Sequence, residues 1–490
     1  MNPTTEQTTA IDTYGDGVDL VLQAGAGCGK SSTLEMTARS DSRRRMLYVA
    51  YNKSIASEAA RSFPGNVTCK TGHGLAFAPC FLPRINRPRQ TAKDAADALD
   101  VRAVLGILGA VPTIKNDMGM ITPMVTKVIM RVALRTVERF CYSADPEITD
   151  HHVPHIDGLD KPETRGALLE LVMPVAAAAW QDIISADGVL KYTHDYYLKR
   201  WALGRPRLPA DVVLLDEAQD TNDVLSSVLL AQHHAQRIAV GDSAQQIYSW
   251  RGANDALSKF VQQLNAPELT LSQSFRFGPA IASQANLWLR LINAPLRLTG
   301  WDACDSSVGP VDAPDAVLCR TNAGAMGLLL EALDDGVKVA MVGGRDDLRR
   351  LAWAAEALQA GRPTDHPEFM AFPSWTAVRE YANEEDNSLK VLVDLIDEHG
   401  TAAILSAADS LIDEKKADLV ISTAHKAKGR EWDYVRIHGD FKAPRPDAQT
   451  GHITLRREEA RLAYVAVTRA RRGLDADALS WVHTVNVVSD

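Results

Sequence analysis

The chain has 490 residues, of which 46% are hydrophobic and 23% charged, and its formal net charge is −9. A chain of this length is too long for one hydrophobic core, so we expect about two to four domains. The composition is ordinary for a soluble globular protein. The negative charge argues against a protein that nucleic acid coats all over, although it leaves room for a local basic groove.

No feature of the sequence indicates a secreted or membrane protein. No apolar run approaches the length that spans a bilayer, and residues 1–7 are polar, unlike the apolar core of a signal peptide. The six cysteines lack the spacing of a zinc site, and we interpret them as reduced thiols. We therefore expect no membrane partner and a cytoplasmic location, or a nuclear one if the source is eukaryotic.

A glycine-rich stretch near the N-terminus indicates a phosphate-binding loop. It follows an apolar run and precedes a segment of helical character. In a strand, glycine loop and helix of this kind, backbone N–H groups surround an anion and the helix N-terminus adds positive partial charge. Lys30 would contact the β- and γ-phosphates, and the Ser31 hydroxyl would bind Mg²⁺. The nucleotide-binding residues expected here are Ala24, Gly25, Ala26, Gly27, Cys28, Gly29, Lys30, Ser31 and Ser32.

The loop departs from the strict pattern at one position, because the pattern has glycine where this chain has Ala24. The alternative interpretation is a glycine-rich turn with a solvated lysine. Cys28 is interpreted as a small neutral residue in the loop, with a redox switch as the less favoured alternative.

Strands and helices alternate in two sections of the chain, which predicts two α/β lobes with parallel sheets. Each section is interrupted by a stretch that reads as helices broken by Pro and Gly turns. The expected domains are a first lobe of residues 1–80 and 205–265, its helical insertion at 81–204, a second lobe of residues 266–345 and 416–490, and its reduced insertion at 346–415.

An apolar strand at residues 212–215 ends in two adjacent carboxylates, Asp216 and Glu217. Ligands bind at this end of the strands in open α/β sheets. Asp216 would hold Mg²⁺ through water, because Mg²⁺ dehydrates reluctantly. Glu217 would orient and deprotonate the attacking water. An isolated Asp-Glu pair is as often a solvated strand end, but together with the glycine loop the pair favours an ATP-hydrolysing site.

Phosphoryl transfer needs positive charge at the γ-phosphate beyond that of Lys30. Two candidates, Arg276 and Arg469, lie in the second lobe. If both reach the phosphates, ATP would draw the lobes together and hydrolysis would release them. Spacing alone does not select these two among the arginines of the chain.

The order and sequence of these motifs resemble the superfamily 1 DNA helicases of the UvrD/Rep/PcrA group. The matching stretches run from Gln7 to Arg469, and the stretches at 193–199, 245–248 and 274–278 favour the F-box DNA helicase branch. The resemblance implies two RecA-like lobes and an ATP-driven motor on single-stranded DNA that moves 3′ to 5′ and unwinds duplexes. The alternatives are a translocase that mainly displaces DNA-bound proteins, such as recombinase filaments, and an ATP-binding regulatory protein with little turnover.

The resemblance also implies roles around the nucleotide, with ATP and Mg²⁺ as cofactors. Gln7 would read the adenine edge, and Phe275 would stack on adenine where the family often has tyrosine. Gln245 would sense the γ-phosphate, and Glu431 would hold the nucleotide through its ribose. The two arginine fingers implied by the resemblance are Arg276 and Arg469.

Single-stranded DNA and its junctions with duplex DNA are the implied macromolecular partners. Trp250 would stack on a base, since every base has a π-face and a motor must grip any sequence; without its motif, a core tryptophan would be favoured. Tyr51 is offset by one residue from the family's aromatic position, which falls at Ala50, and such a shift reverses the side-chain face in an extended segment. The remaining DNA contacts implied by matching motifs are Asn52, Thr71, His73, Arg251, Thr423 and His425.

Three further expectations concern the second insertion, a histidine-rich stretch and the partners of the protein. The gap between Gly344 and Thr423 is too short for the full accessory domain of larger family members, so a reduced insertion is expected. Residues 151–155 read His-His-Val-Pro-His, and we interpret them as a solvated loop because no cysteine or carboxylate frames them at ligand spacing. The resemblance further implies recombinase or repair proteins as partners and a monomer or weak self-association.

Overall fold

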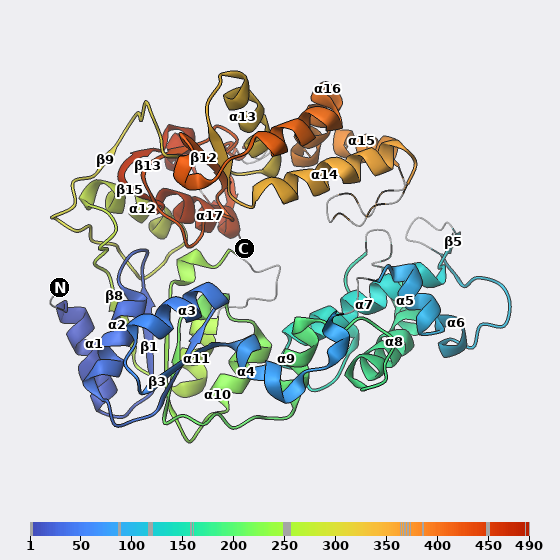
Figure 1. Ribbon diagram of the computed structural model, residues 1–490, viewed down its shortest axis with the longest axis horizontal. Coiled ribbons are helices and arrows are strands. Elements are labelled where there is room, and N and C mark those ends of the chain that lie inside the picture. The colour runs from blue at the N-terminus through green and yellow to red at the C-terminus, as the bar shows by residue number, and fades with distance from the viewer. Residues whose placement is uncertain are drawn as a thin grey trace. The chain divides into compact units, whose positions relative to one another are not determined.

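The computed structural model divides into two compact units (Figure 1). One unit holds residues 1–23 and 30–270, and the other holds residues 24–29 and 271–490. Each contains a six-stranded sheet and flanking helices, which confirms the predicted α/β class. The division of each unit into a lobe and an insertion stays a prediction. The structure describes all residues except 1, 2, 87–89, 116–120, 157, 158, 160, 248–255, 363, 365, 367, 368, 370, 371, 373, 385, 386, 447–450, 486 and 490.

The sheet of the first unit has the strand order β3-β2-β6-β7-β1-β8. The pairs from β3 through to β1 are parallel. Every residue of β1, β2 and β6 is buried, which explains the continuous apolar runs seen in their sequences. The strands are β1 (Leu20–Ala24), β2 (Met46–Ala50), β3 (Val67–Thr71), β6 (Val212–Leu215), β7 (Gln236–Gly241) and β8 (Glu268–Leu271).

Several helices of the first unit begin at side chains that accept hydrogen bonds from the first turn. Thr4 forms a capping box with Gln7, and Asn52 and Thr71 each accept a backbone N–H three residues further on. The helices are α1 (Thr5–Gly15), α2 (Lys30–Ser40), α3 (Lys53–Ser62), α4 (Gly72–Cys80), α10 (Asp223–Leu230) and α11 (Ala256–Leu264).

A helical section separates α4 from β6 in the chain. Its longest helices, α7 and α8, pack against each other. On α7 the buried residues Ile129, Ala133 and Val137 recur at helical spacing and form one face. The section contains α5 (Ala92–Ala98), α6 (Val101–Val104), the antiparallel pair β4 (Thr113–Lys115) and β5 (Ile121–Pro123), α7 (Thr126–Tyr142), α8 (Pro162–Ile184) and α9 (His194–Leu203).

Helix α8 corrects one expectation from the sequence. By length and composition it is apolar enough to cross a membrane, whereas no apolar run of that length was expected. Glu170 interrupts the apolar run in the sequence, whereas the mean hydropathy over the helix stays high. Its buried residues, among them Leu168, Val172 and Ile183, belong to the hydrophobic core of the first unit, which accounts for its apolar character.

A buried lysine lies in the same helical section. The Lys199 side chain is 1% exposed, and its Nζ donates to the carbonyl oxygens of Ser143 (2.8 Å) and Asp145 (2.7 Å). The Nζ also lies 4.0 Å from the centroid of the Phe140 ring. Burial lowers the pKa of Lys199 to about 8 from the ordinary value of 10.5.

This shift predicts that Lys199 makes the stability of the first unit depend on alkaline pH. Between about pH 8 and the ordinary lysine value, the folded protein has released the proton while the unfolded chain still holds it, so stability rises with pH in that window. Relative to Lys199→Met, the free energy of unfolding of the natural protein should rise by roughly 2–3 kcal/mol across the window. Urea unfolding of both proteins, followed by tryptophan fluorescence at several pH values, measures this rise. If the free energies of unfolding of the two proteins differed by the same amount at every pH, the prediction would be wrong.

The sheet of the second unit has the order β11-β12-β10-β13-β15-β9, with parallel pairing throughout. Thr423 and Cys319 occupy matching positions at the carboxyl ends of β12 and β10. The strands are β9 (Ser307–Val308), β10 (Ala316–Cys319), β11 (Val339–Met341), β12 (Leu419–Thr423), β13 (Trp432–Ile437) and β15 (Ala470–Asp475); a separate parallel pair joins β14 (Thr454–Arg456) and β16 (Val487–Ser489).

The helices of the second unit fall into two groups along the chain. Three of them, α14 to α16, follow β11 and precede β12, and Leu351, Ala355 and Ile404 belong to the core that they share. The helices are α12 (Pro279–Leu291), α13 (Asn322–Asp334), α14 (Gly344–Gln359), α15 (Trp375–Glu384), α16 (Asn387–Ser410) and α17 (Arg457–Val467).

Candidate functional site

The carboxyl ends of three neighbouring strands in the first unit carry the predicted catalytic side chains. Strands β6, β7 and β1 are adjacent and parallel. Asp216 and Glu217 directly follow β6, Asp242 directly follows β7, and Lys30 opens α2 after the loop that leaves β1. Because the carboxyl ends of parallel strands meet at one edge, residues far apart in the sequence converge there.

The lysine, the serine and the two carboxylates are in direct contact. The Lys30 Nζ lies 3.4 Å from the Glu217 Oε1. The Ser31 Oγ donates to the Asp216 Oδ2 at 2.6 Å. The Lys30 side chain is only 12% exposed, so its charge is weakly screened by solvent. The structure therefore brings together the four residues from which an ATP-hydrolysing site was predicted.

Tyr48 is a member of this cluster that the sequence did not reveal. Its hydroxyl donates to the Asp216 Oδ2 at 2.6 Å, the same oxygen that accepts from Ser31. Tyr48 lies within β2, where it pairs in register with Leu214 of β6. The sequence feature that could have indicated this contact is a tyrosine within an apolar strand. Every residue of that strand is buried, and a buried hydroxyl needs a hydrogen-bond partner.

The protonation of Asp216 is set by opposing influences. Complete burial raises the pKa of Asp216 above its ordinary value, and the neighbouring Glu217 charge raises it further. Hydrogen bonds from Ser31 and Tyr48 and the charge of Lys30 act in the other direction. A positive charge placed at this carboxylate would therefore favour its ionised form strongly.

The oxygens at this position fit a magnesium ion. The Ser31 Oγ and Asp216 Oδ2 are hard donors separated by 2.6 Å. Adjacent ligands of octahedral Mg²⁺, each about 2.1 Å from the metal, lie about 3 Å apart. A small adjustment of these two side chains would accommodate the ion directly, or a water could lie between it and Asp216.

Glu217 has a backbone conformation that costs free energy. Its φ angle is +50°, in the left-handed region that residues with a Cβ rarely adopt. Gln219 holds its side chain, since the Gln219 Nε2 donates to the Glu217 Oε2 at 2.6 Å. The Gln219 Oε1 in turn accepts from the backbone N–H of Asp242 at 2.9 Å. Strain that the surroundings maintain in this way is typical of functional sites.

Gln245 and Gln7, two further predicted nucleotide contacts, are both buried in the first unit. The Gln245 Nε2 donates to the Asp242 Oδ2 at 2.6 Å, which places it at the same sheet edge as Asp216. The Gln7 Oε1 accepts from the backbone N–H of Thr4, and its Nε2 donates to the Thr33 Oγ1 at 3.0 Å. In this structure the Gln7 amide therefore stabilises the start of α1 and its contact with α2.

The glycine loop itself packs within the second unit. The backbone N–H of Phe275 donates to the Gly27 carbonyl at 2.8 Å, and that of Ala26 donates to the Tyr464 hydroxyl at 3.2 Å. Gly27 has a φ of +74°, and a Cβ built there would lie 2.6 Å from the Arg276 Cβ. The loop therefore requires glycine at this position for both its conformation and its close contact.

Arg276 and Glu431 form an ion pair in the second unit. The Arg276 Nε donates to the Glu431 Oε2 at 2.6 Å, and its Nη1 donates to the Thr468 carbonyl at 3.1 Å. Arg469, which directly follows Thr468 in the chain, is 1% exposed, and its Nε donates to the Val465 carbonyl at 2.8 Å. The structure thus gathers Arg276, Glu431 and Arg469 in one region. Phe275 has its ring centroid 6.3 Å from that of Trp301.

The predicted DNA contacts of the first unit lie at the starts of helices. Tyr51 is 40% exposed just before α3, and Asn52 accepts from the Ile55 N–H at 2.9 Å as the cap of that helix. Thr71 caps α4 by accepting from the Gly74 N–H at 2.9 Å. The His73 Nε2 lies 3.1 Å from the Asp195 Oδ1. Trp250 and Arg251, two other predicted DNA contacts, lie outside the described residues.

The predicted DNA contacts of the second unit follow β12. Thr423 is its last residue and is buried. Burial lowers the pKa of His425, and the positive charge of Arg320 lowers it further, so the neutral imidazole is favoured near pH 7.

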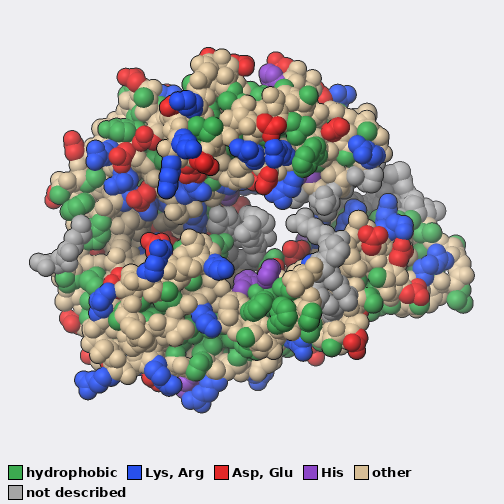
Figure 2. All heavy atoms as spheres, in the orientation of Figure 1, with side chains coloured by type: hydrophobic (Ala, Val, Ile, Leu, Met, Phe, Trp, Pro, Cys, Tyr) green, Lys and Arg blue, Asp and Glu red, His purple; other side chains and the backbone are tan. Residues whose placement is uncertain are grey.

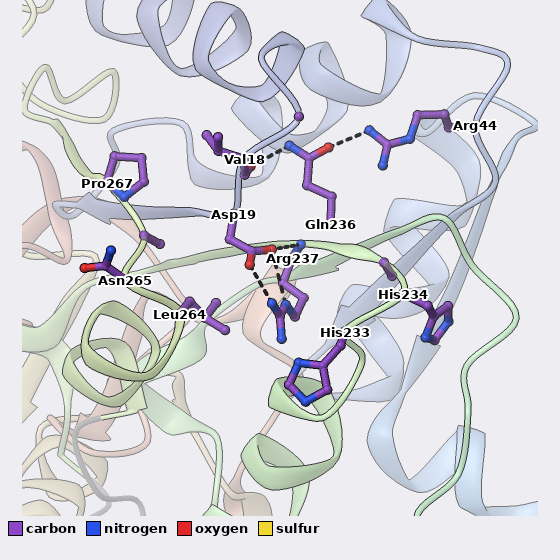
Figure 3. Close-up of a pocket in the computed structure, with 13 residues that line it drawn as sticks. Val18, Asp19, Arg44, His233, His234, Gln236, Arg237, Leu264, Asn265 and Pro267 are labelled. Carbon is purple, nitrogen blue, oxygen red and sulfur yellow. Dashed lines mark hydrogen bonds and ion pairs between the residues drawn. The ribbon is translucent and has the colours of Figure 1, made fainter.

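A polar pocket of about 560 Å³ lies at the opposite edge of the first sheet, at the amino ends of β1 and β7 (Figure 3). Its cationic groups already have partners. Arg237 donates to both carboxylate oxygens of Asp19 (2.6 Å for the shorter bond), and Arg44 donates to the Gln236 side chain. Since the phosphate loop and the carboxylates lie at the carboxyl edge, this pocket is separate from the candidate nucleotide site.

The histidines at 151 and 152 do have a carboxylate beside them, contrary to the reasoning from the sequence. The Nε2 atoms of His151 and His152 lie 2.9 Å and 3.0 Å from the Asp145 Oδ2. However, the backbone N–H of Thr149 donates to the His152 Nδ1, which leaves the proton of the neutral ring on Nε2. A metal could bind that nitrogen only if this arrangement changed, so the cluster is better explained as a local structural contact.

Two parts of the chain match the domain models of the UvrD-like helicases. Residues 176–264 match the UvrD/REP helicase N-terminal domain, and residues 374–478 match the UvrD-like helicase C-terminal domain. These matches confirm the resemblance that the motifs indicated.

Among individual relatives, the chain is 30% identical to F-box DNA helicase protein 1 of Schizosaccharomyces pombe, over 94% of this chain and 55% of that protein. It is 29% identical to F-box DNA helicase 1 of Gallus gallus, over 92% of this chain and 46% of that protein. A shorter match, 32% identical over 22% of this chain and 15% of that protein, is with DNA helicase II of Escherichia coli. The chain thus spans about half the length of the F-box helicases that it matches.

Proposed function

We propose that this protein is an ATP-dependent DNA helicase that moves 3′ to 5′ along single-stranded DNA and unwinds duplexes. The observation that carries the proposal is the contact of Lys30 with Glu217 and of Ser31 with Asp216 at one sheet edge. The relatives named as DNA helicases support DNA as the substrate.

In the proposed reaction, the N–H groups of the glycine loop and Lys30 hold the phosphates of ATP. Ser31 and Asp216 would hold Mg²⁺, which neutralises phosphate charge when it is bound. Glu217 orients the attacking water and accepts its proton. Tyr48 and Gln219 fix the two carboxylates, so that little reorganisation is needed at the moment of reaction.

Residues of both units would couple hydrolysis to movement. Arg276 and Arg469 would stabilise charge on the γ-phosphate as arginine fingers, and Gln245 would sense whether that phosphate is present. Arg276 would exchange its ion pair with Glu431 for the phosphate, which frees Glu431 to accept from the ribose. Phe275 would stack on adenine and Gln7 would read its edge. The DNA contacts proposed are Tyr51, Asn52, Thr71, His73, Trp250, Arg251, Thr423 and His425.

The polarity of unwinding gives the direct test. A DNA duplex with a 3′ single-stranded tail should be unwound with ATP and Mg²⁺, and the same duplex with a 5′ tail should remain closed. A gel or fluorescence assay of strand separation, run beside RNA duplexes of the same sequence, measures both polarity and substrate. Unwinding from the 5′ tail alone would overturn the proposed direction.

Two other functions would give different results in the same assays. A translocase that mainly displaces bound proteins would remove a recombinase filament or streptavidin from single-stranded DNA while it unwinds poorly. A regulatory protein would hydrolyse ATP equally slowly with and without DNA. The contacts of Lys30 with Glu217 and of Ser31 with Asp216 argue against the regulatory protein. The relatives named as DNA helicases favour the helicase over the protein-displacing translocase. We further propose an intracellular location, a monomer or weak self-association, and DNA junctions and recombination or repair proteins as partners.

A further inference from the structure

One face of α4 carries a row of aromatic rings that begins at a predicted DNA contact. His73, Phe77 and Phe81 are spaced four residues apart, so they lie on the same side of the helix and its C-terminal cap. The ring centroids of Phe77 and Phe81 are 5.0 Å apart. The row spans about 12 Å at the rise of an α-helix. We refer to these three residues as the α4 aromatic row.

The row is exposed although its rings are apolar. Phe77 is 42% exposed and Phe81 is 41% exposed. Figure 2 shows histidine side chains beside an apolar patch over α4 and α9. Tyr197 of α9 supports the row from behind, since its ring packs edge-on against His73 (5.9 Å between centroids) and Phe77 (5.8 Å). Large aromatic side chains that are held in place and left open to solvent indicate an interaction site.

Charged side chains of both signs lie near the row, with the cations toward its Phe81 end and a carboxylate at its His73 end. Burial raises the pKa of the Cys80 thiol, and the positive charge of the nearby Arg200 opposes that rise. Lys191 contacts the segment that follows α4, where its Nζ donates to the Ile85 carbonyl at 2.6 Å. The carboxylate next to the row, Asp195, already accepts from His73 and from the Tyr142 hydroxyl. Glu138 accepts from the same Tyr142 hydroxyl at 3.4 Å, so two carboxylates lie at this end of the row and a phosphate backbone would run on the side of the cations.

We infer that the α4 aromatic row is a stacking platform for the bases of single-stranded DNA, with Phe77 and Phe81 extending the contact that begins at Thr71 and His73. Planar rings suit a motor that must bind any sequence, because every base can stack on them. A row of this length accommodates about three stacked nucleotides. The inference rests on the proposed function, because it assigns two further residues to the same DNA site.

Photochemical crosslinking tests the contact directly. An oligothymidylate that carries 5-iododeoxyuridine at single positions should crosslink to the whole 490-residue chain on irradiation. Cleavage with trypsin releases the row in one peptide, residues 71–84. Mass spectrometry should locate crosslinks on Phe77 or Phe81 in that peptide. Crosslinks confined to other peptides would overturn the inference.

Substitutions separate stacking from packing. Phe77→Leu and Phe81→Leu keep apolar volume but remove the flat ring, and each should weaken binding of oligothymidylate about tenfold. Phe77→Tyr and Phe81→Tyr keep the ring and should bind normally. Trp353→Leu, at an aromatic residue of α14 that is 55% exposed, is the matched control and should change nothing. Thermal melting of each variant reports any loss of folding.

The outcomes distinguish this inference from the proposed function. If the natural protein binds single-stranded DNA and hydrolyses ATP in response, the function stands, and leucine variants that bind DNA normally then overturn the platform alone. Such a result would assign the row to another occupant, such as a protein segment. If the natural protein does not bind single-stranded DNA, both the function and the platform are wrong.

Discussion

Replacing Lys30 with alanine is expected to reduce DNA-stimulated ATP hydrolysis by about a hundredfold or more, because removal of one preorganised charge at developing phosphate charge costs a factor of that order. The Lys30 side chain is 12% exposed and lies 3.4 Å from Glu217, so solvent screens its charge only weakly. Unwinding should fall in parallel. Binding of single-stranded DNA should persist, since the proposed DNA contacts lie on other elements.

The control for Lys30→Ala removes a positive charge from the same helix. Arg39 lies in the last turn of α2 and pairs with Glu35 at 2.7 Å on the surface. Surface ion pairs of this kind contribute little to stability, so Arg39→Ala should hydrolyse ATP at a nearly normal rate. Steady-state hydrolysis with saturating oligothymidylate measures both variants. Near-normal turnover by Lys30→Ala would remove the glycine loop from the active site.

The loss of Lys30 should also change the neighbouring carboxylates. Its charge is among the influences that lower the pKa of Asp216, while burial and Glu217 raise it. Without the lysine, Asp216 would hold its proton to higher pH. Since a protonated carboxyl is a poor ligand for Mg²⁺, any residual activity of Lys30→Ala should require more alkaline pH than that of the natural protein.

Much of the candidate site could be predicted because its main residues lie in short, contiguous stretches of the sequence. The glycine loop places Lys30 and Ser31 next to each other, and a strand directly precedes Asp216 and Glu217. Two parallel lobes follow from the alternation of strands and helices. The carboxyl ends of parallel strands meet at one edge of a sheet, so the two stretches could be predicted to lie close together.

The partners of these residues could not be predicted, because they depend on which strands become neighbours. Tyr48 reaches Asp216 only because β2 pairs with β6, in a register that places Tyr48 opposite Leu214. Gln219 likewise links Glu217 to Asp242 because β6 and β7 are adjacent. A single sequence gives the apolar pattern of each strand but not the order of the strands in the sheet.

The carboxylate beside His151 and His152 was missed for a related reason. Asp145 precedes them by a few residues, outside the spacing of a helical or hairpin metal site, and a loop returns it to them. The loop geometry also decides against a metal, since Thr149 fixes the His152 ring through its Nδ1. The conformation of such a loop depends on tertiary packing, and the hydrophobic periodicity of the sequence does not predict it.

The substitution Glu217→Gln should separate the chemical step from nucleotide binding. Glutamine has nearly the shape of glutamate and can still bond with Gln219, but it cannot accept the proton of the attacking water. Loss of a general base costs a factor of about 10² to 10⁴, so the turnover number should fall by about a thousandfold. The affinity for ATP should be unchanged or higher, because a negative charge near the γ-phosphate is removed.

The strained backbone of Glu217 gives a second expectation for Glu217→Gln, which concerns its stability. Its φ of +50° is maintained by the surroundings rather than by the glutamate charge, so Glu217→Gln should melt at nearly the natural temperature. Glu35→Gln, at the surface partner of Arg39, is the matched control and should retain full turnover. Single-turnover hydrolysis and nucleotide binding measured on the same samples distinguish the two steps. If Glu217→Gln kept more than about a tenth of the natural turnover, another group would have to accept the proton of the water, and the contact between Lys30 and Glu217 would be only structural.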